Sequence, residues 1–195
     1  MNGQERRQEL VALLFEELPI QAIVETGTFR GTTTEYFAKL TKVPVYTVEA
    51  DHRLYGFSWI RLKKFSHVHL FQTDSRVALQ RLAQDDAFPK GSVFFYLDAH
   101  WGEDLPLAEE LEQIFSNWHS SWVYIDDFKV EGDDGYSYDD YGPGKALMLD
   151  YIDEIIQRYQ VSVFFQRLHP TKKPGRAEAP FCSPMTRPQL THCVI

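Results

Sequence analysis

The chain has 195 residues, of which 44% are hydrophobic and 25% are charged, so we expect one globular domain over residues 1–195. Asp and Glu number 28 against 20 Lys and Arg, which gives a formal net charge of −8. This acidic balance argues against partners such as nucleic acid, whose phosphate backbone attracts Lys and Arg, and against docking on an anionic membrane.

The cysteine content and the distribution of apolar residues indicate the compartment. The two cysteines are Cys182 and Cys193. One disulfide between them is possible, but two cysteines are too few for a disulfide framework. No apolar run approaches the roughly 20 residues that span a bilayer. The first residues lack the apolar core of a signal peptide. These observations predict a cytoplasmic protein.

Short apolar runs alternate with amphipathic segments along the chain. The runs are rich in Val, Ile, Phe and Tyr, which is typical of strands in a parallel sheet that is covered on both faces. The predicted strands are Ile20–Val24, Val43–Val48, His67–Phe71, Ser92–Leu97, Trp122–Ile125, Val161–Leu168 and Leu190–Ile195. Helices are expected over residues 1–18, after Thr32, Asp51 and Ser75, and through the apolar patterns that begin at Leu107 and Leu147. This order predicts a three-layer α/β sandwich whose last strand pair is antiparallel.

A carboxylate ends each of the first five predicted strands. The five residues are Glu25, Glu49, Asp74, Asp98 and Asp126. Ligands of open parallel sheets bind beyond the carboxyl ends of the strands, so the pattern places five acids along one rim. Helix capping is the alternative for each acid taken alone, and it is strongest for Asp74.

A glycine turn follows the first strand, in the run Glu25-Thr26-Gly27-Thr28-Phe29-Arg30-Gly31-Thr32. Gly27 allows a tight turn that brings bare backbone close to a ligand, and Gly31 allows the next helix to begin against the sheet. The N-terminus of that helix favours a bound carboxylate or phosphate. The spacing differs from the dinucleotide pattern and from a Walker A loop. A plain strand-to-helix turn is the other interpretation.

Two further strand ends continue the pattern. Glu49 is placed to accept hydrogen bonds from ribose hydroxyls, and Asp74 and Ser75 are placed near an adenine edge. With the glycine turn, they resemble the cofactor-binding elements of class I S-adenosylmethionine-dependent methyltransferases. The resemblance implies a Rossmann-like, doubly wound, mostly parallel sheet of seven strands. The cofactor-binding residues that we predict are Glu25, Gly27, Thr28, Gly31, Thr32, Glu49, Asp74, Ser75 and Trp101.

The fourth and fifth strands lead into Asp98-Ala99-His100-Trp101 and Asp126-Asp127. Three carboxylates at adjacent strand ends are suited to share one Mg²⁺, which would relieve their mutual repulsion; capping and solvation are the alternative. The motifs are similar to those of metal-dependent O-methyltransferases of the catechol type and of the macrocin and novobiocin sugar type. The resemblance implies Asp98, Asp126 and Asp127 as Mg²⁺ ligands. Gly102 stands where the catechol type has a Lys base.

We therefore expect S-adenosylmethionine-dependent, Mg²⁺-assisted O-methyl transfer to a hydroxyl of a small molecule, such as a sugar or a diol-bearing metabolite. Asp98, ahead of His100, is the predicted catalytic base, with packing as the alternative for His100. Residues 129–144 are a predicted lid or a plain solvated loop. The competing hypotheses are a metal-dependent phosphohydrolase built on the same acids with His100, and a non-catalytic cofactor-binding domain. The sequence does not identify the methyl acceptor, and it leaves open whether the chain forms a homo-oligomer.

Overall fold

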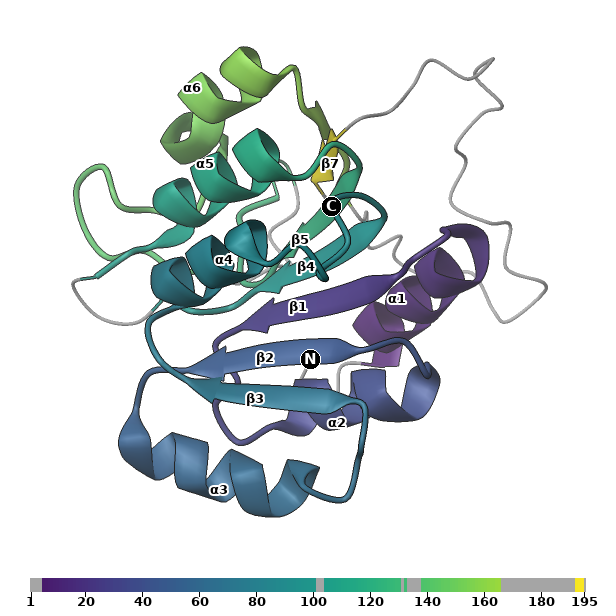
Figure 1. Cartoon of the computed structure of the whole chain (residues 1–195). Helices are drawn as coiled ribbons and strands as arrows, with labels where there is room; N and C mark the ends of the chain where they lie inside the picture. The colour runs from purple at the N-terminus through teal and green to yellow at the C-terminus, as the bar shows by residue number, and fades with distance from the viewer. Residues whose placement is uncertain (1–4, 101–103, 131, 133–137, 166–191, 195) are drawn as a thin grey trace, which may run out of the picture.

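The computed structural model describes residues 5–100, 104–130, 132, 138–165 and 192–194, which form a three-layer α/β sandwich (Figure 1). The strands are β1 (Ala22–Thr26), β2 (Val45–Glu49), β3 (Val68–Gln72), β4 (Val93–Leu97), β5 (Ser121–Ile125), β6 (Ser162–Val163) and β7 (His192–Val194). The helices are α1 (Glu5–Glu17), α2 (Thr32–Leu40), α3 (His52–Leu62), α4 (Ser75–Gln84), α5 (Leu107–Asn117) and α6 (Leu149–Tyr159). Within the described ranges, no helix is long and apolar enough to cross a bilayer.

The sheet has the strand order β3-β2-β1-β4-β5-β7-β6. All pairs among β1 to β5 are parallel, which confirms the predicted Rossmann-like, mostly parallel fold. The order reverses direction between β1 and β4, and a crevice at such a point is where open α/β sheets bind ligands. The fold thus directs attention to the carboxyl ends of these two strands.

The prediction of an antiparallel last strand pair is wrong. Ser162 of β6 lies opposite Cys193 of β7 in a parallel pair, and β7 also pairs with β5 in parallel. The chain from residue 164 to residue 191 separates β6 from β7. A connection of that length permits a parallel return, whereas a tight hairpin turn does not.

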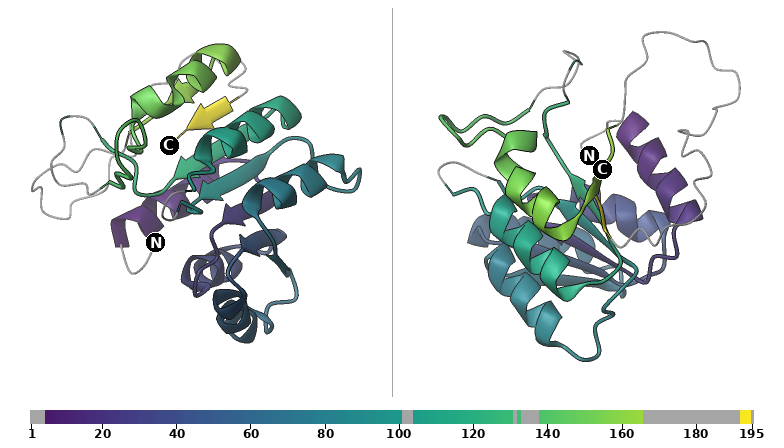
Figure 2. Two further views of the ribbon diagram at one scale, coloured as in Figure 1. Left: turned by 90° about the vertical axis from the view of Figure 1, so that its left-hand side faces the viewer. Right: turned by 90° about the horizontal axis from the view of Figure 1, so that it is seen from above.

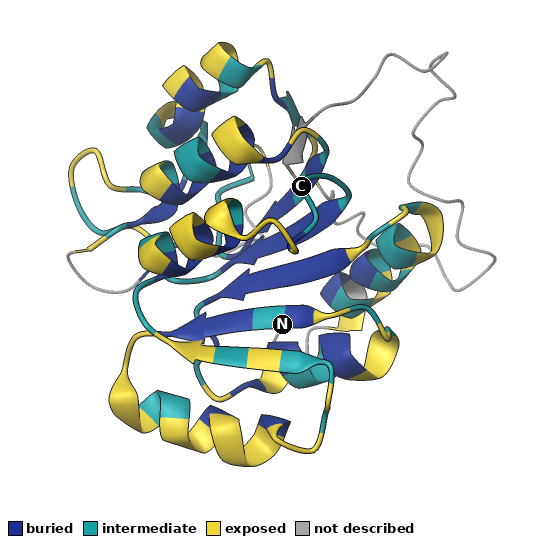
Figure 3. Ribbon diagram, in the orientation of Figure 1, coloured by how far each residue is buried: buried dark blue, intermediate teal, exposed yellow. Residues whose placement is uncertain are grey.

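Burial explains why the central strands are continuous apolar runs. Every residue of β1 and β4 is buried, because helices cover both faces of the sheet at its centre (Figure 3). The edge strand β3 is largely exposed. Helices α4, α5 and α6 pack on one face, and α1 and α2 pack on the other (Figure 2).

Helix α1 is held on its face of the sheet by aromatic packing. Val11 is fully buried in a cluster with Ile23 and Phe37. The ring of Phe15 lies 5.0 Å from that of Phe94, measured between centroids, in an edge-to-face arrangement. This packing brings Arg7, in the first turn of α1, to the same end of the sheet as the predicted site.

Candidate cofactor and acceptor site

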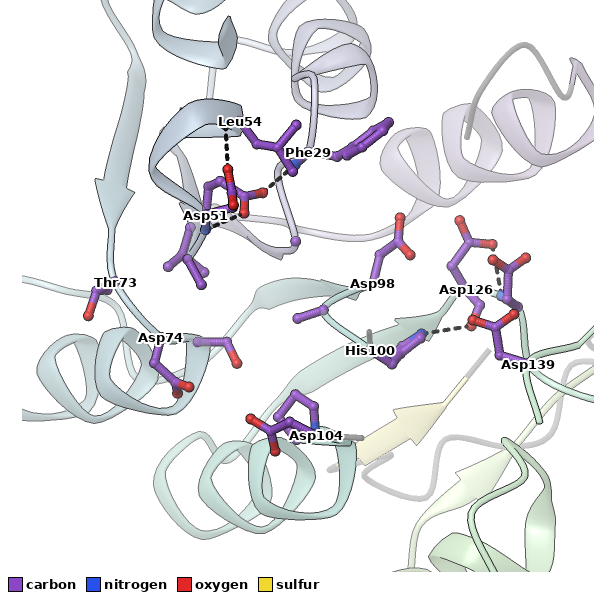
Figure 4. Close-up of a pocket in the computed structure, with 18 of the residues that line it drawn as sticks. Phe29, Asp51, Leu54, Thr73, Asp74, Asp98, His100, Asp104, Asp126 and Asp139 are labelled. Carbon is purple, nitrogen blue, oxygen red and sulfur yellow. Dashed lines mark hydrogen bonds between the residues drawn. The ribbon is translucent and has the colours of Figure 1, made fainter. Parts of the chain in front are cut away.

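A cavity of about 700 Å³ opens at the carboxyl ends of β1 to β5. One side, which we call the glycine-turn end, is formed by Gly27, Phe29, Glu49, Asp51 and Asp74. The other side, which we call the acid end, is formed by Asp98, His100, Asp126, Asp127 and Asp139. Figure 4 shows Phe29, Asp51 and Asp74 toward one side of this space and Asp126 and Asp139 toward the other, with Asp98 between them.

The turn after β1 has the tight geometry that the sequence predicts at Gly27. Its φ is +80°, and a Cβ added there would lie 2.0 Å from the carbonyl oxygen of Asp98, so no other residue fits without movement of the backbone. The amides of Gly27 and Thr28 both donate to the carbonyl of Val48, at 3.1 and 3.0 Å. The backbone of β1, β2 and β4 is therefore locked together at the floor of the cavity.

Glu49 joins two turns through its carboxylate. One oxygen, Oε2, accepts from the amide of Phe29 at 2.7 Å, and the other accepts from the amide of Asp51 at 2.8 Å. Burial raises the pKa of Glu49, although the amide donors of Asp51 and Phe29 oppose the rise. Each carboxylate oxygen can accept a further hydrogen bond, so Glu49 can hold the turn and still bind a ligand hydroxyl.

Four of the predicted cofactor residues do not line the cavity. They are Glu25, Thr28, Gly31 and Thr32. Glu25 is still inside β1, where its buried carboxylate accepts hydrogen bonds from the hydroxyls of Thr34 in α2 and Thr47 in β2. Burial raises the pKa of Glu25 to about 7. Its side chain points toward the face that α2 covers and therefore supports the glycine turn from behind.

The other three residues build the turn itself. The hydroxyl of Thr28 lies 2.6 Å from that of Thr47, and both residues are buried. Gly31 is the N-cap of α2 and has a left-handed φ of 71°, while Thr32 begins that helix. A Cβ at Gly31 would meet the side chain of Leu62 at 3.1 Å, so the helix start packs against α3 and not against the cavity.

Asp74 caps a helix and also lines the cavity, so both interpretations of this residue apply. Its carboxylate accepts from the amide of Arg76 at the start of α4 and pairs with the Arg76 guanidinium at 2.7 Å. The side chain of Arg76 holds the pKa of Asp74 below its usual range. Ser75, beside it, lines the same wall.

At the acid end, burial shifts the pKa of Asp98 and that of His100 in opposite senses. Burial raises the pKa of Asp98 to about 7, and the negative charges of Asp127 and Asp139 add to the rise. Burial lowers the pKa of His100 to about 4. Its Nε2 lies 3.3 Å from the carbonyl oxygen of Asp126, and this contact requires a proton on Nε2 because a carbonyl can only accept. Of Asp98 and His100, Asp98 is the one that titrates near neutral pH.

The predicted metal triad is not present as a triad. The guanidinium of Arg7, from α1, donates to Oδ1 of Asp126 and lies 3.6 Å from Oδ1 of Asp127. The hydroxyl of Tyr96 donates to the other oxygen of Asp126. Across the described ranges, no group of three or more His, Cys, Asp or Glu is arranged to hold a metal ion. This arrangement does not support the predicted Mg²⁺ site, because an arginine engages the central carboxylate.

Sequence reasoning missed several lining residues. Tyr141 and Asp139 lie in the segment predicted as a lid, and the Tyr141 hydroxyl is 2.6 Å from the Asp139 carboxylate and 2.7 Å from the carbonyl of His100. The acidic and aromatic composition of that segment was their signal. Phe29 has a left-handed φ of 50°, and nothing in the sequence of the glycine turn distinguished it from its neighbours. No local signal marked Arg7. Trp101 and residues 131 and 133–137 lie outside the described residues.

Comparisons with known proteins find similarity in structure but none in sequence families. No family model matches the chain, and no curated protein matches it. An O-methyltransferase from Bacillus cereus, solved in complex with SAH, is similar in structure, with a TM-score of 0.50 and 17% sequence identity. This chain has the same fold. The match covers 60% of this chain and 52% of that one.

Two further structures have TM-scores below that value. A protein described as a caffeoyl-CoA O-methyltransferase from Staphylococcus aureus has a TM-score of 0.49 and 16% identity, and the match covers 79% of this chain and 70% of that one. A protein described as an O-methyltransferase from Klebsiella pneumoniae has a TM-score of 0.47 and 21% identity over 60% and 51%. The chain spans about half the length of the Bacillus and Klebsiella proteins. At 17% identity, the likeness to the Bacillus protein is one of fold.

Proposed function

We propose that the protein is an S-adenosylmethionine-dependent O-methyltransferase that acts on a hydroxyl of a small molecule. The glycine-turn end carries this proposal, because it combines bare backbone at Gly27 with a carboxylate at Glu49 at the point where the sheet reverses direction. The shared fold with an O-methyltransferase that binds SAH supports it.

The cavity fits a nucleoside cofactor in size and in chemistry. Its volume of about 700 Å³ lies within the range of small-molecule sites. In the proposed arrangement, Gly27 faces the methionine part, Glu49 binds the ribose hydroxyls, and Asp74 with Ser75 lies near adenine. Phe29 and Leu54 add apolar wall at the same end. Trp101 stays a predicted contact.

The bound cofactor supplies an activated methyl group, so the chain itself must position the acceptor and remove its proton. When bound, the cofactor would supply the methyl group from its sulfonium to the acceptor oxygen and would itself become S-adenosylhomocysteine. Asp98 accepts the hydroxyl proton in this proposal, because its pKa of about 7 keeps much of it ionised at neutral pH. His100, with a pKa of about 4, is the weaker base.

Mg²⁺ does not fit the acid end as the residues are arranged, and we assign it no step. The carboxylate of Asp126 is already engaged by Arg7 and by Tyr96. The phosphohydrolase hypothesis needs the same carboxylates to hold a metal, and it assigns no role to the glycine turn. Because acids dominate the acid end, we propose neutral or cationic hydroxylated acceptors in the cytoplasm, with neither nucleic acid nor a membrane as partner.

Calorimetry with S-adenosylhomocysteine in EDTA, and again in Mg²⁺, tests the proposal. We expect saturable binding of one ligand per chain under both conditions, and absence of binding would overturn the cofactor assignment. Transfer of a labelled methyl group to a panel of hydroxylated metabolites then tests catalysis. Binding without transfer to any acceptor would favour the non-catalytic cofactor-binding domain.

A further inference from the structure

We infer that Arg7 takes the position of a divalent cation at the acid end, so that the chain neutralises its own carboxylates and excludes Mg²⁺. The inference concerns charge in the cavity, and it stands whether or not the chain transfers methyl groups. It also makes α1 part of the functional site, since Arg7 lies in the first turn of that helix.

The guanidinium bridges two neighbouring carboxylates in the way that a metal ion would. One terminal nitrogen donates to Asp126 and the other lies 3.6 Å from Asp127. The planar fork of arginine has several donors directed to one side, which suits two carboxylates at once. The side chains of Arg7 and Asp126 are only 11% and 6% exposed, so solvent screens this ion pair weakly.

Both carboxylate oxygens of Asp126 accept hydrogen bonds from donors of the chain itself. Oδ1 accepts from Arg7 and from the amide of Asp127 at 3.0 Å, and Oδ2 accepts from the hydroxyl of Tyr96. A metal ion needs lone pairs that point toward it, and a guanidinium in the same place repels it. The structure thus provides both a steric and an electrostatic barrier to a cation at Asp126.

Two further contacts show that Arg7 is held in place by its helix. The hydroxyl of Tyr36 in α2 donates to the carbonyl of Gln8 at 2.6 Å, one residue along from Arg7. The next turn of α1 places Val11, which is fully buried, on the sheet. The position of Arg7 therefore follows from tertiary packing of α1 and not from a free surface side chain.

The cavity around Arg7 is strongly acidic. Among the described residues that line the cavity, Arg7 is the sole Lys or Arg, whereas the acid end alone carries Asp98, Asp126, Asp127 and Asp139. Loss of Arg7 would remove the guanidinium beside Asp126 and Asp127 and leave the four carboxylates with less positive charge next to them. Hard oxygen ligands in such a cluster are the kind that Mg²⁺ binds, so removal of Arg7 would open a cation site that the native chain lacks.

Titration calorimetry with MgCl₂ on the full chain tests this inference, using Arg7→Gln, Arg7→Lys and the exposed control Arg81→Gln. We expect no saturable Mg²⁺ binding to the wild type, to Arg7→Lys or to Arg81→Gln, and saturable binding to Arg7→Gln. In EDTA, the Tm of Arg7→Gln should fall by roughly 5–15 °C, and Mg²⁺ should restore part of it. The Tm of Arg81→Gln should stay within about 2 °C of wild type.

Three outcomes would overturn the inference. One is saturable Mg²⁺ binding to the wild type that Asp126→Asn abolishes, and another is a folded Arg7→Gln variant that binds no Mg²⁺. The third applies if Arg7→Gln does not fold in EDTA. We then expect the variant to become soluble when it is purified in Mg²⁺. Insolubility both in EDTA and in Mg²⁺ would contradict the inference. Arg7→Lys keeps the positive charge but lacks the planar guanidinium, so it separates the effect of charge from that of guanidinium geometry.

Discussion

The two ends of the cavity are built from different ranges of sequence. The glycine-turn end is formed by the turns that follow β1, β2 and β3, between Gly27 and Ser75, and backbone amides make many of its contacts. The acid end joins Arg7 from α1, the strand ends of β4 and β5, and the segment that contains Asp139 and Tyr141. The first end is made by three consecutive strand-to-helix turns, whereas the second joins segments that lie far apart in the sequence.

The ends also differ in their electrostatics. Backbone amides donate to Glu49, and the first turn of α4 with the Arg76 side chain donates to Asp74, so both carboxylates at the glycine-turn end have donors from neighbouring turns. At the acid end, burial raises the pKa of Asp98 to about 7 and lowers that of His100 to about 4. We therefore expect changes at the first end to affect fold and cofactor affinity, and changes at the second to affect rate.

Gly27→Ala should have the largest effect. A Cβ there would lie 2.0 Å from a backbone oxygen, and the φ of +80° is unfavourable for alanine. We expect a loss of about 3 kcal/mol or more in the free energy of unfolding, measured with urea, and no detectable binding of S-adenosylhomocysteine. Gly56→Ala is the control, because nothing lies within 4 Å of an added Cβ and α3 should gain about 0.5–1 kcal/mol. Wild-type stability in Gly27→Ala would show that the turn is not locked.

Asp98→Asn should lower the rate of methyl transfer by about 10²–10⁴-fold and leave the affinity for S-adenosylhomocysteine within about threefold of wild type. In the wild type, the rate should rise as the pH rises through about 7 and then level, because the base acts in its ionised form. Asp86→Asn, at an exposed position, should change neither quantity. A rate loss accompanied by an equal loss of cofactor affinity would contradict the separation of the two ends.

Glu49→Ala should produce the reverse pattern. The variant loses the acceptor for the amides of Phe29 and Asp51 and the proposed acceptor for ribose hydroxyls. We expect the affinity for S-adenosylhomocysteine to fall by about 30–100-fold, or about 2–2.7 kcal/mol, in calorimetry. Glu154→Ala, on the exposed side of α6, should bind as the wild type does. Unchanged affinity in Glu49→Ala would remove this residue from the cofactor site.

Glu110→Gln should have the smallest effect, and one that depends on pH. Glu110 of α5 is completely buried, neither oxygen has a hydrogen-bond partner of normal geometry among the described residues, and the hydroxyls of Ser75 and Thr26 only partly offset its burial. Burial raises its pKa from 4.5 to about 7, so the folded chain holds a proton that the unfolded chain releases between these values.

The contribution of Glu110 to stability should therefore fall as the pH rises from about 4.5 to about 7, and should be flat above that. We expect Glu110→Gln to exceed the wild type by about 1–2 kcal/mol in urea unfolding at pH 8 and to match it near pH 4.5. Glu154→Gln should follow the wild type at both pH values. A Glu110→Gln variant that is less stable than wild type at pH 8 would show that the carboxylate is ionised and bound in the folded chain.

The sequence predicted the core strands because continuous apolar runs mark strands that are buried on both faces. The predicted Ser92–Leu97 and the observed β4 differ by one residue, whereas the predicted Ile20–Val24 is shifted by two residues from β1. The shift explains the error at Glu25: the residue expected at the strand end lies inside the strand and is buried under α2. Gly27 and Glu49 were predictable because a tight turn and the strand end that follows it are local features.

Short-range patterns along the chain thus determined the alternation of strands and helices, the glycine turn and the row of acids at one rim. Tertiary structure decided which of those acids face the cavity, how β6 and β7 pair, and what neutralises Asp126. Arg7 and Asp126 are 119 residues apart, and neither periodicity nor spacing links them. Their contact depends on the packing of α1 against the sheet, because only the folded chain brings that guanidinium to the end of β5.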